Sequence, residues 1–270
     1  MTRIIGISGR KQSGKNTSAN YLHGLVLSEK RPPNNESLIN DFRIEDNGSL
    51  WINTSNQNGQ VGWGEFDVSR KDMEFVAYAE REMWPLVKLY SFADSLKFMA
   101  VDMFNIEPRQ VWGTDEDKNE LIHLKWEDMP GVWTTTDDET FLMYDGLKYT
   151  KHAPGYMTAR EFLQYFGTEV MRKIYTPVWV ENTLKRIYEE QTQLAIICDV
   201  RFPDEVDGIL DVGGEVIRLT RSPENDTHES ELALDPDKYD HNKFTHIVDN
   251  EAIGIDGLCE ILKSVYNKGV

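Results

Sequence analysis

Short apolar runs alternate with amphipathic stretches along most of the chain. Continuous apolar residues predict buried strands at residues 4–8, 85–93, 194–200, 213–221 and 245–250. Apolar residues at helical spacing predict helices at residues 15–27, 69–83, 94–104 and 158–172, after residue 176 and from about residue 255. Strands that are apolar on both faces and separated by helices favour an α/β fold with a mostly parallel five-stranded sheet flanked by helices.

Two polar, irregular segments interrupt this alternation near residues 34–65 and 113–150. The first is rich in glycine and asparagine and is expected to hold a small hairpin. In the second, alternating apolar residues around Asp145 and Gly146 predict a β-hairpin. Thr158, followed three residues later by Glu161, predicts a capped start for the helix at 158–172. We therefore expect one domain, residues 1–270, with two insertions.

The composition narrows the class of protein. The chain has 270 residues, 40 % of them apolar, which is enough to build a sizeable core. It carries 29 basic and 46 acidic residues, a net charge of -17, and this disfavours binding to nucleic acid. Most of the acidic residues are expected to serve solubility, and a small basic site for a nucleotide remains compatible with this surface.

The cysteines and the apolar runs indicate where the protein works. Cys198 and Cys259 are far apart and neither belongs to a C-x-x-C pair, which argues against a disulfide framework and a zinc site. The N-terminal apolar run is too short for a signal peptide, and no stretch approaches membrane-spanning length. We expect a cytoplasmic protein without a membrane partner.

The segment "GRKQSGKNTS", residues 9–18, has the spacing of a phosphate-binding loop, a P-loop. Gly9, Gly14 and Lys15 fit the pattern G-x-x-x-x-G-K-[ST], and they lie between a predicted strand and a predicted helix. Asn16 occupies the position of the usual hydroxyl, and Thr17 supplies a hydroxyl one residue later. Lys11 adds a second cation, which suits a site for more than one phosphate group. An ordinary glycine-rich turn is the less favoured alternative.

The segment "CDVRFPDE" resembles the end of a Walker B strand. Asp199 closes an apolar strand, where a carboxylate orients magnesium or its water. Arg201 and Glu205 follow, and Arg201 can point into the crevice at the carboxyl ends of the strands. The simpler alternative is that Asp199 only caps the next helix, but the P-loop elsewhere favours a functional role.

Other candidate residues lie on the second strand, on the helix at 158–172 and near the C-terminus. Asp94 and Lys97 follow the second strand at the ligand-binding edge of the sheet. Arg160, Gln164 and Thr168 share a polar helix face, which is either solvated or reads an acceptor base and phosphate. Weaker candidates are Trp179, as a base-stacking surface, and Arg218, Arg221 and His228 after the fourth strand.

With these pieces in order, the chain resembles the deoxynucleoside monophosphate kinases of tailed bacteriophages, members of the P-loop nucleoside monophosphate kinase superfamily. The resemblance rests on "ISGRKQSGKNT", "YSFADSLK", "TAREFLQYFGTEVMR", "PVWV", "IICDVRFPDE", "GGEVIRLTR" and "NDTHESE". It covers the core from both ends, and the two insertions match poorly. The resemblance implies a P-loop kinase fold with a mobile lid, ATP as phosphoryl donor, Mg²⁺ as cofactor, a deoxynucleoside monophosphate as acceptor, and a homodimer.

The resemblance also implies roles for single residues. The ATP phosphates and magnesium would be held by Gly9, Ser13, Gly14, Lys15, Asn16 and Thr17. Asp199 would lie near the metal, directly or through water, and Arg221 would contact ATP. The acceptor would be surrounded by Lys11, Asp94, Lys97, Arg160, Gln164, Trp179, Arg201 and Glu205. Arg172 and the segment 218–231 would be the candidates for stabilising transition-state charge and for lid or adenine contacts. The catalytic set would comprise Lys15, Arg160, Arg172, Asp199 and Arg201.

Three alternatives stay open beside this reading. Another small-molecule P-loop kinase, such as one similar to dephospho-coenzyme A kinase, would share the fold. A P-loop NTPase that acts on DNA is disfavoured by the net charge of -17. The third alternative is a protein that binds nucleotides without catalysis. The sequence does not indicate which base is accepted.

Overall fold

The computed structural model describes residues 2–31, 36–55, 59–70, 72–130, 143–144, 147–148, 154–223 and 229–268. The chain divides into two compact units. The first unit comprises Met1–Phe92 and Thr183–Val270, and the second comprises Ala93–Asn182. Each unit has a hydrophobic core made of its own residues. Whether residues 1–270 act as one domain with insertions stays a prediction.

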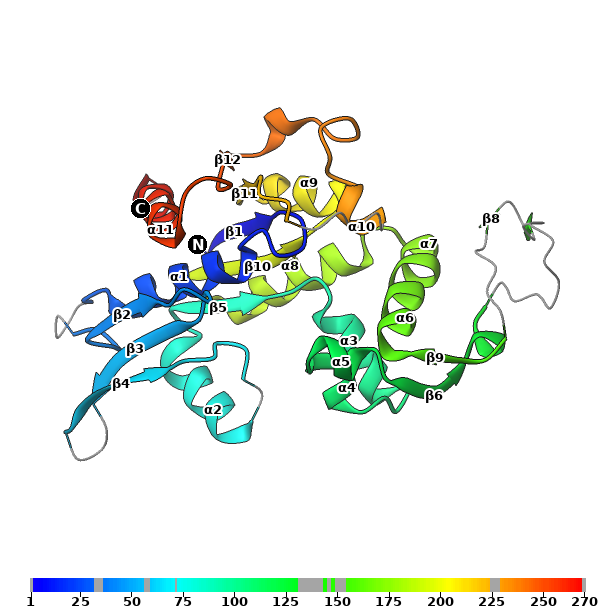
Figure 1. Cartoon of the computed structure of the whole chain (residues 1–270), viewed down its shortest axis with the longest axis horizontal. Helices are drawn as coiled ribbons and strands as arrows, with labels where there is room; N and C mark the ends of the chain where they lie inside the picture. Colours follow the sequence, from blue (N-terminus) through cyan, green and yellow to red (C-terminus); the bar gives the residue numbers. More distant parts are fainter. Residues whose placement is uncertain are drawn as a thin grey trace. The chain divides into compact units, whose positions relative to one another are not determined.

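A five-stranded sheet organises the first unit (Figure 1). Its strands lie in the order β12 (His246–Val248), β11 (Glu215–Leu219), β1 (Arg3–Ser8), β10 (Leu194–Val200) and β5 (Val87–Tyr90). Each neighbouring pair is parallel. The predicted α/β fold, with a parallel five-stranded sheet flanked by helices, is therefore confirmed, and all five predicted strands form it.

Helices cover both faces of this sheet, as alternate residues of β1 illustrate. Ile5 and Ile7 are fully buried in a core that they share with α1 (Lys15–Ser28) and α11 (Ile255–Lys268). Gly6 points to the opposite face, where a Cβ atom would lie 2.6 Å from Ile209 of α9 (Pro203–Asp211). The missing side chain therefore lets α9 pack closely on the sheet.

The order of the strands places a switch point beside β1. After β1 the chain forms β5 at one edge of the sheet and then β10 between β1 and β5. It then forms β11 and β12 on the opposite side of β1. Because all neighbours are parallel, their carboxyl ends meet at one edge of the sheet. Ligands of open α/β sheets bind at this edge, next to the switch point. The loop that follows β1 lies there.

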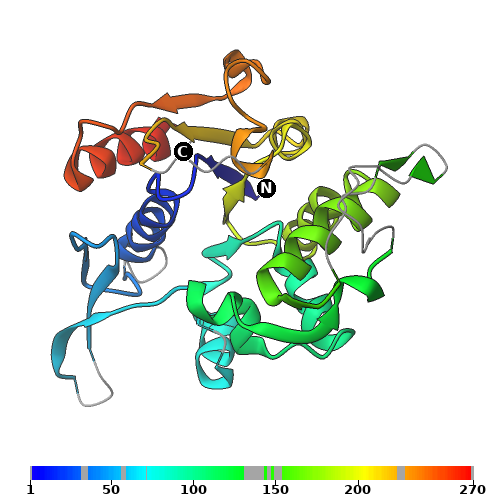
Figure 2. The same cartoon turned by 45° about the vertical axis from the view of Figure 1, so that its right-hand side comes forward.

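The predicted insertion at 34–65 forms a three-stranded antiparallel sheet against α1 (Figure 2). It consists of β2 (Asp41–Ile44), β3 (Leu50–Ser55) and β4 (Val61–Glu65), so the expected hairpin is confirmed and has a third strand. Phe42 packs directly over Gly24 of α1. The chain then continues through α2 (Met73–Tyr78) and the π-helix η1 (Ala79–Met83) to β5.

The second unit is mainly helical. It contains α3 (Asp94–Asp102), α4 (Pro108–Trp112), α5 (Asp115–Lys118), η2 (Trp126–Asp128), α6 (Ala159–Gln164), η3 (Tyr165–Met171), α7 (Arg172–Ile174) and the start of α8 (Val178–Glu190). β6 (Leu121–Lys125) pairs with β9 (Tyr156–Thr158), and β7 (Met143–Tyr144) pairs with β8 (Leu147–Lys148). The second pair confirms the predicted hairpin, while Asp145 and Gly146 lie outside the described residues. α10 (Glu229–Leu232) and η4 (His241–Lys243) complete the first unit.

The helix predicted at 158–172 has the right extent but is not a uniform α-helix. Its capped start is confirmed, because Thr158 and Glu161 form a capping box. From Tyr165 to Met171 the helix widens to a π-helix. The carbonyl of Gly167 accepts both the N–H of Arg172 and the indole N–H of Trp179, at 3.1 Å. A side chain that enters the helical ladder in this way is a known cause of irregular turns, and α-helical periodicity does not reveal it.

The contact between Gly24 and Phe42 gives a test of how the insertion is held. A Cβ atom at residue 24 would lie 2.4 Å from the Phe42 ring, so Gly24→Ala forces this partly buried ring to move. We expect a loss of about 1–3 kcal/mol in the free energy of unfolding, measured with urea, despite the better helix propensity of alanine. Gly64→Ala is the control, because its Cβ atom meets nothing within 4 Å. Equal stability of Gly24→Ala and wild type would contradict the packing.

Candidate phosphate-binding site

The loop between β1 and α1 depends on backbone conformations that favour glycine. Gly14 precedes α1 with φ of 103°, in the left-handed region, and Gln12 has φ of 58°. A Cβ atom on Gly9 would lie 2.3 Å from the hydroxyl of Ser13. Both predicted loop glycines are therefore required by the local geometry, one by its backbone angle and the other by a close approach.

The N-terminus of α1 is open to an anion. No side chain caps this helix within the part of the chain that the structure describes, and its first turn contains no acidic residue. The N–H groups of the first turn, at Lys15, Asn16 and Thr17, have no acceptor inside the helix. Such a terminus concentrates N–H donors and the positive end of the helix dipole, which favours a phosphate.

Lys15 lies at the centre of this loop. Its ammonium donates to the carbonyl oxygens of Gly9, at 2.6 Å, and Arg10, at 2.7 Å. Burial, followed by the charge of Arg201, lowers the pKa of Lys15 to about 8, and the carboxylate of Glu231 opposes this shift. Lys15 thus lies within the loop where the sequence pattern predicts it, and its surroundings on balance destabilise its charge.

Two side chains that the sequence analysis did not single out fix the loop. Glu231 of α10 is buried and accepts the backbone N–H of Lys11 at 2.7 Å and the guanidinium of Arg201 at 2.5 Å. Asn250, also buried, donates to the carbonyl of Ser13 at 2.7 Å and accepts the N–H of Arg221 at 3.0 Å. In the sequence, Glu231 ends the segment "THESE" and Asn250 ends the segment "VDN", just after β12. These two segments were the signals from which the residues could have been found.

Other basic residues surround the same loop. Arg221 also donates to the carbonyl of Gln12 at 2.7 Å, which supports its predicted position beside the loop. Arg10 pairs with Asp235 at 2.7 Å, and the buried Arg218 donates to Ser8 at 2.9 Å. The hydroxyl of Ser13 is buried and has no hydrogen-bond partner among the described residues. His228 lies outside the described residues.

Asp199, near the end of β10, is tied to the neighbouring strand. Its carboxylate accepts the hydroxyl of Ser91 at 2.5 Å and the backbone N–H of Phe92 at 2.9 Å. Glu205, by contrast, is buried in α9 and accepts the backbone N–H groups of Arg201 and Phe202, at 2.6 and 3.0 Å. Asp199 therefore stands at the ligand-binding edge, while Glu205 holds the start of α9 and the position of Arg201.

The turn at Gly48 brings the insertion against the first turns of α1. A Cβ atom on Gly48 would lie 2.3 Å from the hydroxyl of Thr17, and the amide of Asn20 donates to the Gly48 carbonyl at 2.9 Å. Thr17 thus packs against the insertion, whereas Asn16 is exposed. The two candidate metal contacts therefore have different surroundings.

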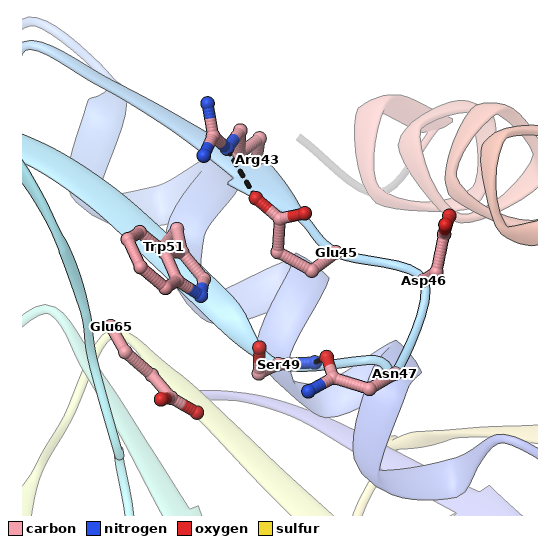
Figure 3. Close-up of a pocket in the computed structure, with 7 residues that line it drawn as sticks. All are labelled: Arg43, Glu45, Asp46, Asn47, Ser49, Trp51 and Glu65. Atoms are coloured by element: carbon pink, nitrogen blue, oxygen red, sulfur yellow. Dashed lines mark hydrogen bonds and ion pairs between the residues drawn. The ribbon is translucent and has the colours of Figure 1, made fainter.

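Beside this turn, the insertion sheet carries a hollow of about 500 Å³ (Figure 3). Arg43 forms an ion pair with Glu45 at 2.6 Å and lies over the rings of Trp51 and Trp63. The hollow is lined by Arg43, Glu45, Asp46, Asn47, Ser49, Trp51 and Glu65. Three carboxylates against one guanidinium do not suit a phosphate, so the loop and α1 form the candidate phosphate site of the first unit.

Six of the predicted site residues belong to the second unit. Asp94 and Lys97 lie on the first turns of α3, and Arg160 and Gln164 lie on α6. Arg160 donates to Asn119 at 3.0 Å and to Asp115 at 2.7 Å. Gln164 is exposed at the end of α6.

Arg172 and Trp179 belong to the segment that follows Gln164. Arg172 starts α7 directly after the wide turn of η3. Trp179 is buried and its indole N–H is bonded to Gly167, so it fixes η3 in this structure. Its role as a stacking surface stays a prediction.

Comparisons with known proteins provide an observation that is separate from the loop geometry. Residues 145–254 match the model of the deoxynucleotide monophosphate kinase family. A protein of Acanthamoeba polyphaga mimivirus, whose name assigns it provisionally to the deoxynucleotide monophosphate kinases, is 29 % identical over 159 residues, or 53 % of this chain and 67 % of that protein. The chain is a relative of the deoxynucleotide monophosphate kinases. These two matches support the predicted family and enzyme class.

The family match and the loop are separate observations. The matched residues include Arg160, Gln164, Asp199 and Arg201, but they exclude residues 9–17. The kinase interpretation therefore does not depend on the loop pattern alone. Within the described residues there is no helix long and apolar enough to cross a membrane, and no group of three or more His, Cys, Asp or Glu side chains that would hold a metal by itself.

The pKa of Lys15 predicts how nucleotide binding depends on pH. Below about pH 8 Lys15 is charged, and above it the free protein loses this charge. We expect the affinity for ATP, measured by titration calorimetry, to fall by about twofold from pH 7 to 8 and then by up to about tenfold per pH unit. The phosphates of ATP, with a last pKa of about 6, do not change charge in this range.

Lys15→Arg separates this effect from other causes. Arginine keeps its charge at these pH values, so the decline above pH 8 should disappear in the variant. A wild-type affinity that stays level up to pH 9 would show that the charge of Lys15 does not control binding.

Proposed function

We propose that this chain transfers the γ-phosphoryl group of ATP to the phosphate of a deoxynucleoside monophosphate and so forms a deoxynucleoside diphosphate. The single observation that carries the donor half is the uncapped N-terminus of α1, with Lys15 beside it, at the switch point of the sheet. The match of residues 145–254 to the deoxynucleotide monophosphate kinase family supports the acceptor half.

The proposed reaction needs charge neutralisation more than proton transfer. An oxygen of the acceptor phosphate forms a bond to the γ-phosphorus, and the bond from that phosphorus to the β,γ-bridging oxygen breaks, leaving ADP. The attacking oxygen is already anionic, so no general base is required. The protein must align two polyanions and neutralise the transferring group. Basic side chains and N–H donors of the kind found around α1 suit this task.

In this proposal the loop residues bind the donor. The N–H groups of the first turn of α1 hold the phosphates, Lys15 bridges the β- and γ-phosphates, and Arg221 contacts the rest of ATP. Asn16, which is exposed, and Asp199 would hold Mg²⁺ together with the phosphates, directly or through water. Their oxygen atoms fit this ion, and the packing of Thr17 against Gly48 favours Asn16 over Thr17. When bound, Mg²⁺ neutralises phosphate charge.

The remaining predicted residues would serve the acceptor. In the first unit these are Lys11 and Arg201, with Glu205 acting through the position of Arg201. In the second unit they are Asp94, Lys97, Arg160, Gln164 and Trp179, with Arg172 for transition-state charge. We further propose that the diphosphates feed the synthesis of deoxynucleoside triphosphates for viral DNA replication, in the cytoplasm of the host.

A panel of acceptors tests the proposed reaction. ADP formation from ATP and Mg²⁺ is measured with dGMP, dTMP, dAMP or dCMP, and with dephospho-coenzyme A as the competing acceptor. We expect at least one deoxynucleoside monophosphate to raise the rate well above the hydrolysis measured without acceptor. A rate stimulated only by dephospho-coenzyme A, or only by DNA, would overturn the proposal in favour of the corresponding alternative.

The role of Lys15 is tested by Lys15→Met. We expect transfer to fall by at least about 100-fold, because the variant loses the cation placed at the transferring phosphates, while the fold is retained. Lys185→Met is the matched control, since Lys185 is exposed and only weakly paired with Glu189, at 3.8 Å. Circular dichroism and thermal melting establish that both variants are folded. Normal turnover in folded Lys15→Met would contradict the assigned role.

A further inference from the structure

Among the described residues of the second unit, two partly buried lysines form no ion pair. Lys97 lies on α3 and Lys118 is the last residue of α5, and both are partly buried. Neither ammonium makes a hydrogen bond or ion pair with any residue that the structure describes. A partly buried lysine normally extends to solvent or finds a carboxylate, so two such residues call for an explanation.

Packing brings these lysines together with Arg160. Phe98, next to Lys97, packs at a tilt against Trp112 of α4, with ring centroids 5.2 Å apart. Gly113 lies close against the carboxylate of Asp117, next to Lys118. The guanidinium of Arg160 donates to Asp115 and Asn119, which lie on either side of Lys118 in the sequence. Three cations from α3, α5 and α6 therefore form one cluster.

The cluster is electrostatically unfavourable as it stands. Burial, followed by the charge of Lys97, lowers the pKa of Lys118, and Arg160 contributes in the same direction. Asp115 and Asp117 act against this shift without cancelling it, because Asp115 is already paired with Arg160. Like charges held together in a folded protein are a recurring feature of sites that bind an opposite charge.

We propose that Lys118, together with Lys97 and Arg160, binds the phosphate group of the deoxynucleoside monophosphate acceptor. A phosphate dianion offers several oxygen acceptors and a charge that matches these donors. The inference rests on the proposed function and adds a residue to it. Lys118 lies in the insertion at 113–150, where the resemblance is poor, and outside the family match at 145–254. The proposed third cation therefore comes from outside the residues that match the family.

Kinetics of Lys118→Gln test this assignment. We expect the KM for the best acceptor among dGMP, dTMP, dAMP and dCMP to rise by about tenfold or more, because a charge-assisted hydrogen bond is lost. The KM for ATP should stay within about twofold, since the loop that binds ATP retains all its residues. Lys185→Gln removes an equivalent charge from an exposed position and should leave all constants unchanged.

Thermal melting distinguishes phosphate binding from a structural role. Without ligand, Lys118→Gln should be as stable as wild type or more stable, because repulsion within the cluster decreases. The rise in melting temperature that the acceptor causes in wild type should shrink in the variant. Inorganic phosphate serves as a second probe, and its binding should weaken in the same way.

The outcomes separate the two proposals. If wild type phosphorylates an acceptor but Lys118→Gln has the same acceptor KM, the role of Lys118 is wrong and the function stands. A lower stability of the ligand-free variant, with unchanged phosphate binding, also overturns that role in favour of a structural one. If wild type shows no kinase activity but binds inorganic phosphate through Lys118, the proposed function fails and the anion site stands.

Discussion

An uncapped helix terminus is the constraint on which the rest of the first unit depends. Gly14 turns the chain through the left-handed region directly before α1, and no side chain of the described residues then covers the N–H groups of the first turn. This helix end lacks the stabilisation of about 1 kcal/mol that a side-chain cap usually contributes. The loop must therefore be held in place by contacts elsewhere, and Asn250 and Glu231 provide them from distant parts of the sequence.

The same contacts reconcile a basic site with an acidic protein. The net charge of -17 belongs to the whole chain, yet burial, followed by the nearby charges of Arg201 and Arg218, lowers the pKa of Lys15. Glu231 limits the repulsion by accepting Arg201 while it also anchors the backbone of Lys11. One buried carboxylate thus fixes the loop and compensates part of its charge. The remaining excess of positive charge is available to the phosphates of a ligand.

The sequence predicted the sheet well because strands depend on local patterns, and the position of the loop follows from such a pattern too. The five strands are marked by continuous apolar runs, and the loop by Gly9, Gly14 and Lys15 at fixed spacing. Glu231 and Asn250 escaped notice because their partners lie more than two hundred residues away, at Lys11 and Ser13. Helical periodicity did not predict the wide turn of η3. The indole of Trp179, which donates to the carbonyl of Gly167, lies outside the predicted helix in the sequence.

The cations of the second unit illustrate a different limit. Lys97 and Arg160 could be selected from the sequence, since each follows a recognisable motif. Lys118 could not, because it follows three acidic residues of a capped helical turn and reads as part of a solvated face. Only the packing of α5 with α3, α4 and α6 brings Lys118 near Lys97 and Arg160. A phosphate-binding loop is encoded in one continuous segment, whereas a cluster of this kind exists only after tertiary folding has brought three elements together.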